Sequence, residues 1–150
     1  MKTIKIILLC VLVCLFVGCE KDKIKSPYFS NFVGKYSITE NYVAIGGEGD
    51  TIATSTKYYT LLISGTRDNK YDLQFNAIDA YIFEGNVKAN ILDDSTFSFE
   101  HKFPAYDSFG VIRGDGIINL ASNTIKMNYT ACGPNAHGYH FYNATGTKIQ

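Results

Sequence analysis

The chain has 150 residues, a formal net charge of zero and a hydrophobic content of 46%. This length suffices for one domain, and the hydrophobic content excludes a disordered chain. The balanced charge gives no indication of a nucleic-acid partner. Tyrosine (11) and phenylalanine (10) are abundant and tryptophan is absent. Because aromatic residues are enriched in strands, this composition favours an all-β domain.

The N-terminal segment has the pattern of a bacterial signal peptide. Lys2 and Lys5 supply a positive start, and an uninterrupted apolar run of twelve residues follows at 6–17. A helix needs about 20 apolar residues to span a bilayer. The run is therefore too short for a membrane span and has the length of a signal-peptide core.

The apolar run ends in Phe16, Val17, Gly18 and Cys19, and this ending resembles the lipobox of bacterial lipoproteins. The resemblance implies a signal peptide at 1–18, cleavage before Cys19 and a lipid on the Cys19 thiol. Each buried CH₂ of an acyl chain contributes about 0.8 kcal/mol to membrane binding, so several chains anchor firmly. The alternative is an ordinary signal peptide with an incidental cysteine.

Residues 19–29 are expected to form a lipidated tether between the membrane and the domain. Loss of Lys2 and Lys5 leaves the mature chain with a net charge of about −2. Lys21 and Asp22 follow the lipidated position and resemble the charged export tags of Bacteroidota surface lipoproteins. The expected location is the outer membrane of such a Gram-negative cell, with the periplasmic or surface face left open.

The cysteine count agrees with lipidation. Cys10 and Cys14 leave with the signal peptide, and Cys19 carries lipid, so Cys132 is the one remaining thiol. An intramolecular disulfide is then impossible. A single cysteine in a strand-like run is more often a small buried apolar residue than a nucleophile.

Alternation with period two recurs along the rest of the chain and predicts strands. Eight segments are expected, at 34–43, 57–64, 70–76, 80–91, 96–103, 109–120, 124–132 and 138–148. The connections are too short for crossover helices and are rich in Gly, Asn, Asp and Ser. We therefore predict one domain at 30–150, an eight-stranded antiparallel up-and-down barrel; an open two-layer sandwich is the alternative.

Three short stretches resemble small lipocalin-like lipoproteins of Bacteroidota. They are residues 32–40 (FVGKYSITE), 112–116 (IRGDG) and 145–148 (TGTK). In lipocalins a Gly-x-Trp on the first strand packs under a basic side chain from near the chain end. The resemblance implies that Gly34, Tyr36 and Lys148 plug the floor of the barrel. Tyr36 as a simple core aromatic is the alternative.

Two functions remain open. In the first, the barrel is a binding module for a small apolar ligand or an envelope protein. The candidate lining residues are Tyr36, Ile38, Phe75, Phe83, Phe97 and Phe99. The same residues as plain core are the alternative. In the second, the protein is an accessory envelope lipoprotein with a filled barrel and an exposed apolar patch at one end. A monomer is expected in either case.

No pattern for enzymatic chemistry is found. Nucleophile elbows, phosphate loops and paired carboxylates are absent from the sequence, so an enzyme is not expected and no cofactor is implied. His101, His137 and His140 lack the spacing of metal ligands. Thr51 and Ser95 lie in three-residue patterns that resemble Bacteroidota O-glycosylation acceptors.

Overall fold

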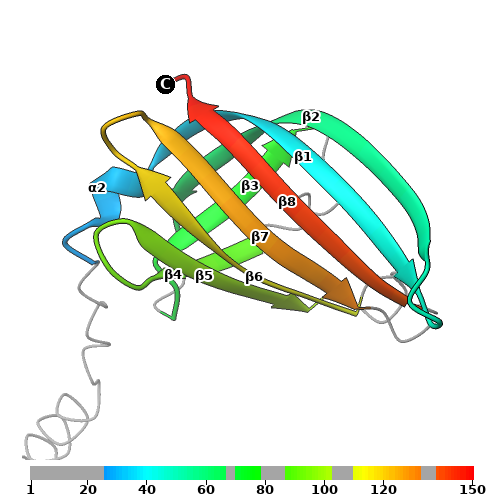
Figure 1. Ribbon diagram of the computed structural model, residues 1–150. Coiled ribbons are helices and arrows are strands. Elements are labelled where there is room, and N and C mark those ends of the chain that lie inside the picture. Colours follow the sequence, from blue (N-terminus) through cyan, green and yellow to red (C-terminus); the bar gives the residue numbers. More distant parts are fainter. Residues whose placement is uncertain (1–25, 67–69, 79–86, 103–109, 133–137) are drawn as a thin grey trace, which may run out of the picture.

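The strands pair in sequence order to form one closed sheet. The computed structural model describes residues 26–66, 70–78, 87–102, 110–132 and 138–150. The elements are α2 (Phe29–Phe32), β1 (Gly34–Gly46), β2 (Thr51–Gly65), β3 (Leu73–Ile78), β4 (Val87–Ile91), β5 (Thr96–Lys102), β6 (Val111–Asn119), β7 (Thr124–Cys132) and β8 (Gly138–Lys148). Each strand is antiparallel to the next, and β8 pairs back with β1 (Figure 1).

The contact between β1 and β8 closes the barrel. Its register runs without interruption from Tyr36 opposite Lys148 to Gly46 opposite Gly138. Closure removes the free strand edges that an open sheet would expose. The predicted eight-stranded up-and-down barrel is therefore confirmed, and the alternative of an open sandwich is wrong.

Alternation along each strand separates an inner from an outer face, as period-two geometry requires. On β1, Tyr36, Ile38 and Glu40 are buried while Ser37 and Asn41 are exposed. The inner positions of all eight strands contribute to a single core cluster, which Phe32 of α2 joins from one end. The core is thus the barrel interior.

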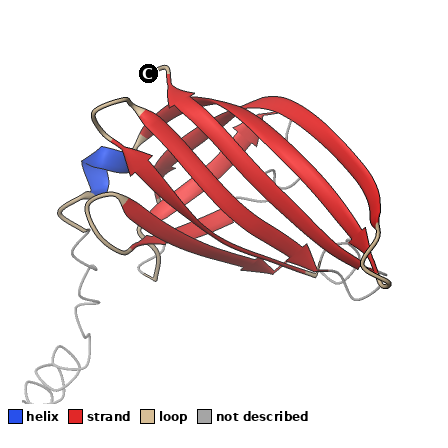
Figure 2. Cartoon of the chain, viewed as in Figure 1, coloured by secondary structure: helices blue, strands red, loops and turns tan. Residues whose placement is uncertain are grey.

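The barrel has two different ends. The end that we call the floor carries α2, the C-terminus and the short connections after β4 and β6 (Figure 2). Here the Asn31 side chain donates a hydrogen bond to the carbonyl of Asp94, at 2.9 Å, and Lys35 pairs through its backbone with Gln150. The opposite end, which we call the mouth, carries the β1–β2 turn and the ends of β5 and β7.

Several element boundaries differ from the sequence prediction. β2 begins at Thr51 and not at residue 57. The prediction missed its first half because residues 51–58 pair only with β1 and are exposed, so they show no alternation of apolar and polar side chains. β3 begins at Leu73 and not at residue 70. Of the strand expected at 80–91, only the part from Val87 lies within the described residues. The sequence did not predict α2, which at four residues is too short to show a helical period.

Candidate functional site

The predicted ligand-lining residues form the barrel core. Tyr36, Ile38, Phe75, Phe97 and Phe99 are all buried. Phe75 has its ring centroid 5.3 Å from that of Phe97 and 5.7 Å from that of Phe99, both edge-to-face. These side chains therefore pack on one another. The sixth candidate, Phe83, lies outside the described residues.

Glycines on the inner face of β6 and β8 make room for this packing. A Cβ on Gly116 would lie 2.7 Å from Cε1 and 2.8 Å from Cε2 of Phe97. A Cβ on Gly114 would lie 2.7 Å from Cζ of Phe99, and one on Gly146 would lie 3.1 Å from Cγ2 of Ile125. Real side-chain atoms do not approach to 2.7–2.8 Å, and a contact of 3.1 Å is tight. The described part of the interior is therefore filled by side chains at these levels.

Gly34, Tyr36 and Lys148 meet at the floor of the barrel. The Lys148 Nζ lies 5.8 Å from the centroid of the Tyr36 ring, within cation–π range. A Cβ on Gly34 would lie 3.2 Å from that Nζ. The Tyr36 hydroxyl donates to the Phe32 carbonyl at 3.0 Å, and burial raises the pKa of Tyr36 to about 12. These contacts join α2 and the C-terminal strand under the core.

A buried carboxylate lies nearer the mouth. Glu40 on β1 is only 3% exposed, and its Oε2 accepts hydrogen bonds from the Tyr59 hydroxyl, at 2.9 Å, and from the Tyr129 hydroxyl. Burial, followed by the charge of Glu40, raises the pKa of Tyr59. Burial also raises the pKa of Tyr129, with the neighbouring Tyr59 and Glu40 adding to it. Both hydroxyls therefore stay neutral donors at physiological pH.

Two further aromatic residues extend this cluster toward the mouth. Tyr142 stacks on Tyr129 with centroids 4.7 Å apart, and Tyr42 lies 5.1 Å from Tyr142. The Tyr42 hydroxyl and the His140 Nδ1 share a hydrogen bond of 2.8 Å. We call Tyr42, Tyr59, Tyr129 and Tyr142 the tyrosine cage. The period-two pattern places Glu40 on the same face as Tyr36 and Ile38, but no local pattern in the sequence shows that this acid is buried.

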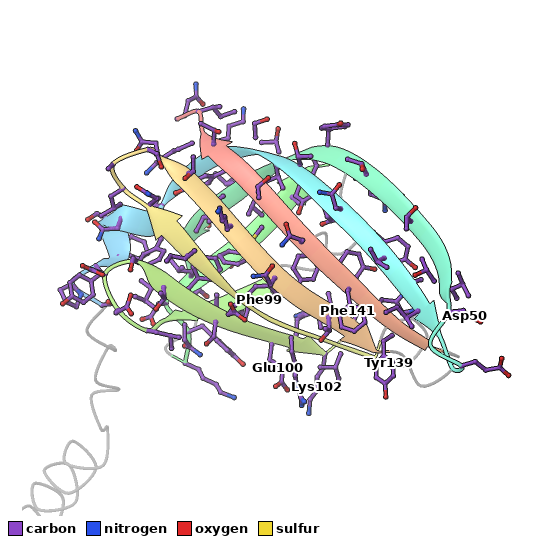
Figure 3. All side chains as sticks on the ribbon, viewed as in Figure 1. Asp50, Phe99, Glu100, Lys102, Tyr139 and Phe141 are labelled. Carbon is purple, nitrogen blue, oxygen red and sulfur yellow. The ribbon has the colours of Figure 1, made fainter. Side chains whose placement is uncertain are left out.

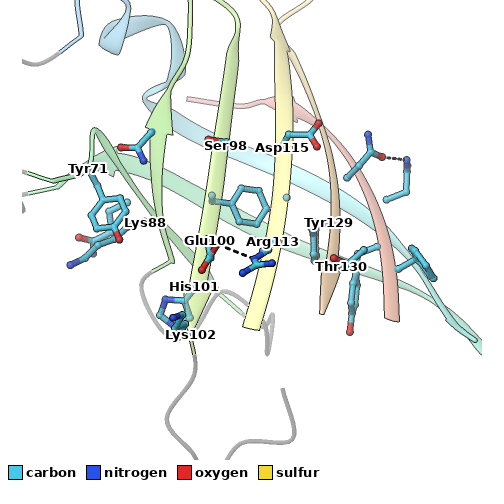
Figure 4. Close-up of a pocket in the computed structure, with 18 of the residues that line it drawn as sticks. Tyr71, Lys88, Ser98, Glu100, His101, Lys102, Arg113, Asp115, Tyr129 and Thr130 are labelled. Atoms are coloured by element: carbon cyan, nitrogen blue, oxygen red, sulfur yellow. Dashed lines mark hydrogen bonds and ion pairs between the residues drawn. The ribbon is translucent and has the colours of Figure 1, made fainter. Parts of the chain in front are cut away.

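A depression along the barrel wall is lined mainly by outward-facing residues of β1 and of β3 to β8 (Figure 4). It has a volume of about 1760 Å³, and we call it the outer groove. Most of its lining side chains are polar. The polar members are Asn41, Lys70, Gln74, Lys88, Asn90, Ser98, Glu100, His101, Lys102, Arg113, Asp115, Asn128, Thr130 and Asn143, and the others are Val43, Tyr71, Phe99, Gly114, Tyr129, Phe141 and Tyr142. Sequence reasoning missed this site.

A row of polar side chains crosses the outer groove from strand to strand. Its members face one another directly in the register of neighbouring strands: Asn41, Asn143, Asn128, Asp115, Ser98 and Asn90. The Asn143 Nδ2 donates to the Asn128 Oδ1 at 2.6 Å. With strands about 4.8 Å apart, the row extends over roughly 24 Å. We call this set the polar row.

Charged and aromatic residues flank the polar row. Arg113 and Glu100 form an ion pair of 2.9 Å on the outer face of β5 and β6, drawn as a dashed line in Figure 4. At one side of the groove, the Tyr71 ring lies 5.4 Å from the Lys70 Nζ and 5.6 Å from the Lys88 Nζ. At the other side Phe141 is 42% exposed. The groove thus offers hydrogen-bonding groups between two aromatic side chains.

A second exposed feature lies at the mouth. Tyr139 is 61% exposed, and its ring centroid lies 6.4 Å from that of Phe141 (Figure 3). On the adjacent strand, Ile45 and Val43 stand opposite these two residues. We call these four residues the mouth patch. The hypothesis of an accessory envelope lipoprotein predicts an exposed apolar patch at one end of the barrel.

The other predicted positions can be placed briefly. Thr51 is exposed at the start of β2, and the Ser95 hydroxyl donates to the Asp93 carboxylate at 3.2 Å. Cys19 and the side chain of Cys132 lie outside what the structure describes. Burial, followed by the charge of Lys88, lowers the pKa of His101.

Two features are absent from the described parts of the chain. In these parts no three His, Cys, Asp or Glu side chains gather as metal ligands. None of the helices described there is long and apolar enough to cross a membrane.

Comparison with known proteins does not assign the chain to a family. No protein-family model matches the chain, and no characterised protein matches its sequence.

Proposed function

We propose that the chain is a lipid-anchored envelope lipoprotein whose barrel binds a hydroxyl-rich glycan chain on its outer surface. The observation that carries the proposal is the outer groove with its polar row. The buried aromatic side chains leave no comparable space among the described inner residues near Phe97 and Phe99. A binding role is therefore better supported outside the barrel than inside it.

The chemistry of the groove suits a glycan. Asparagine side chains both donate and accept hydrogen bonds, as sugar hydroxyls do. Phe141 and Tyr71 at the margins offer apolar ring faces on which a sugar ring can stack. Neighbouring members of the polar row, about 4.8 Å apart, can contact successive units of a chain that follows the curved wall of the barrel. A protein interface would instead have few charged residues at its centre.

The charge balance of the groove favours an acidic glycan over a neutral one. Four basic side chains line it, Lys70, Lys88, Lys102 and Arg113, against the two acidic side chains Glu100 and Asp115. Attraction between exposed charges is screened by salt, with a Debye length of about 8 Å at 0.15 M. Binding of an acidic glycan should therefore weaken as the salt concentration rises.

The anchor is proposed from the sequence. The lipobox-like ending at Cys19 and the charged segment that follows it support a lipid anchor in the outer membrane of a Gram-negative cell. A tethered module would hold its ligand close to the cell. The barrel itself would act as a rigid scaffold, because binding-site side chains on strands are held in position more precisely than side chains on loops.

The test is a glycan titration of the detergent-solubilised full chain, measured by calorimetry. Alginate oligosaccharides serve as the acidic probe and cello-oligosaccharides as the neutral one. Replacing both Asn128 and Asn143 with alanine should weaken alginate binding at least about tenfold, or 1.4 kcal/mol. Asn76→Ala, on the outer face of β3 and away from the groove, is the matched control. Equal affinity in all three proteins, or no saturable binding of either probe, would contradict the proposal.

A protein partner is the second candidate function, and the mouth patch favours it. Exposed aromatic residues of this kind are enriched at protein interfaces. Tyr139→Ser distinguishes the two functions, because Tyr139 belongs to the mouth patch and does not line the outer groove. Loss of an envelope crosslink in this variant, with glycan binding unchanged, would support a partner at the mouth. An unchanged crosslinking pattern would count against it.

A further inference from the structure

Exposed apolar side chains from four separate segments meet at the floor of the barrel. Tyr28 comes directly before α2, Leu92 begins the β4–β5 connection, Leu120 begins the β6–β7 connection, and Ile149 follows β8. We call these four residues the floor rim. Their segments lie together at the end of the barrel that carries α2 and the C-terminus (Figure 1). Exposed apolar side chains gathered in this way mark a surface that contacts a membrane or another protein.

Hydrogen bonds hold the segments of the floor rim in fixed positions. In the β4–β5 connection, the Asp93 Oδ1 accepts from the Thr96 amide at 2.7 Å. The Asn31 side chain ties this connection to α2. The Lys148 amide donates to the Asn123 carbonyl at 2.8 Å, which ties the β6–β7 connection to the C-terminal strand. The floor rim is therefore carried on one hydrogen-bonded surface.

The length of chain between Cys19 and the barrel decides which end can face a bilayer. Ser26 accepts a hydrogen bond from Phe29 at the floor and follows Cys19 by seven positions. Fully extended, this stretch spans at most about 25 Å. The 13 residues of β1 rise about 40 Å, which at a strand tilt of about 40° is roughly 30 Å along the barrel axis. A lipid on Cys19 would therefore hold the floor beside the bilayer, because the chain is too short to bring the mouth there.

We propose that the floor rim is a membrane-contact surface, which seats the barrel on the bilayer with its mouth pointing away. The inference rests on the proposed lipid anchor at Cys19 and is independent of glycan binding. Tyrosine is enriched at membrane–water interfaces, which suits Tyr28. Apolar side chains of surface-bound proteins enter the boundary of headgroups and acyl chains to a depth of about 5–10 Å, which suits the leucine and isoleucine members. The anchor keeps the floor rim close to lipid, so that even a weak contact is populated.

The contact is apolar and not electrostatic. Asp93 and Asp94 lie directly beside Leu92 in the chain. Their charges would be repelled by anionic lipid headgroups, so the matching partner is a zwitterionic bilayer. Because apolar contact does not depend on screened charges, seating should be unchanged when the salt concentration rises.

The experiment is NMR of the lipidated full chain in phosphatidylcholine nanodiscs that contain a phosphatidylcholine with a spin label close to its headgroup. The methyl signals of Leu92, Leu120 and Ile149 should be broadened by the label. The matched control is Ile52, which is 65% exposed compared with 51% for Ile149 but lies beside the β1–β2 turn at the mouth. Its signals should stay sharp. Equal broadening of Ile52 and Ile149 would overturn the proposal.

The same sample separates failure of the anchor from failure of the floor rim. A chain without added lipid mass that elutes apart from the nanodiscs would refute the anchor, and the seating of the barrel with it. A lipidated chain that elutes with the discs but shows no broadening of the floor rim would refute the contact surface alone. Floor-rim shifts that grow with the number of chains per disc, without a response to the spin label, would assign the surface to a second copy and also overturn the proposal.

Variants test the contribution of the apolar side chains. Replacing both Leu92 and Leu120 with serine should reduce the broadening of Ile149 at least about twofold, because interfacial binding scales with buried apolar area. Ile52→Ser, at the mouth, is the matched control and should leave that broadening unchanged. The core methyl signals of Ile38 report whether each variant is folded. Unchanged broadening of Ile149 in the folded double variant would overturn the proposal, and the comparison of Ile149 with Ile52 in the unmutated chain tests it even if the variant fails to fold.

Discussion

Replacing Gly116 with alanine should destabilise the barrel strongly. The new methyl group would meet the ring of Phe97, with Cε1 at 2.7 Å, and ordinary contact begins near 3.4 Å. The ring cannot withdraw easily, because Phe75 lies 5.3 Å away and Phe32 lies 5.9 Å away, both edge-to-face. Overpacking of this kind costs about 1–3 kcal/mol, and the confined ring places Gly116→Ala at the upper end.

The assay is urea unfolding of the full chain, with thermal unfolding as a second readout. A loss of about 3 kcal/mol lowers the melting temperature by roughly 12 °C, at about 4 °C per kcal/mol for a domain of this size. Gly47→Ala is the matched control, because a Cβ there has no neighbour within 4 Å. That exposed change should stay within about 0.5 kcal/mol.

A double variant tests whether the clash is the cause. Phe97→Leu removes the ring that the new methyl group meets, so adding it to Gly116→Ala should cost less than the two single changes together. For residues in contact, a coupling energy of about 1 kcal/mol or more is expected. If Gly116→Ala costs less than about 0.5 kcal/mol, there is free space beside Phe97 and the interior is not filled at this level.

Three further predictions concern the floor and the anchor. Lys148→Met should cost about 0.5–1 kcal/mol in urea unfolding through loss of the cation–π contact with Tyr36, and an unchanged stability would contradict that contact. The folded-state pKa of Tyr36 is raised from 10.0 to about 12, so its contribution to stability is complete below pH 10 and is lost as the pH rises toward 12. Tyr36→Phe should reduce that alkaline loss, and an identical pH profile in both proteins would refute the assignment. Cys19→Ala should release the protein from membranes and remove the lipid from its mature mass; continued membrane partitioning with an unaltered mass would refute the anchor.

The strands of the barrel wall could be predicted from the sequence because each strand shows a local alternation of apolar and polar side chains. Residues 34–43 show period two with apolar side chains on one face, and the structure buries that face. β2 was only partly predicted, because its first half pairs with β1 alone and has no buried face to produce a pattern. β6 has no bulge at Gly114 and Gly116, and these glycines leave space for Phe99 and Phe97, which no local pattern indicates.

The sites were harder to predict because they depend on register between strands far apart in sequence. The polar row joins Asn41 to Asn143 across the β1–β8 closure, and no local pattern pairs these two residues. The sequence did place Glu40 on the inner face. Its role needed the positions of Tyr59 and Tyr129, which come from β2 and β7.

Glycan binding in the outer groove can be tested directly by a chemical-shift titration of the full chain with alginate oligosaccharides. The side-chain amide signals of Asn41, Asn128 and Asn143 report on the outer groove, and the methyl signals of Ile38 and Met127 report on the core. Binding in the outer groove should give saturable shifts of the asparagine amides while the core methyl signals stay unchanged. Saturable shifts of the Ile38 and Met127 methyl groups, with the asparagine signals unmoved, would place the ligand inside the barrel and contradict it.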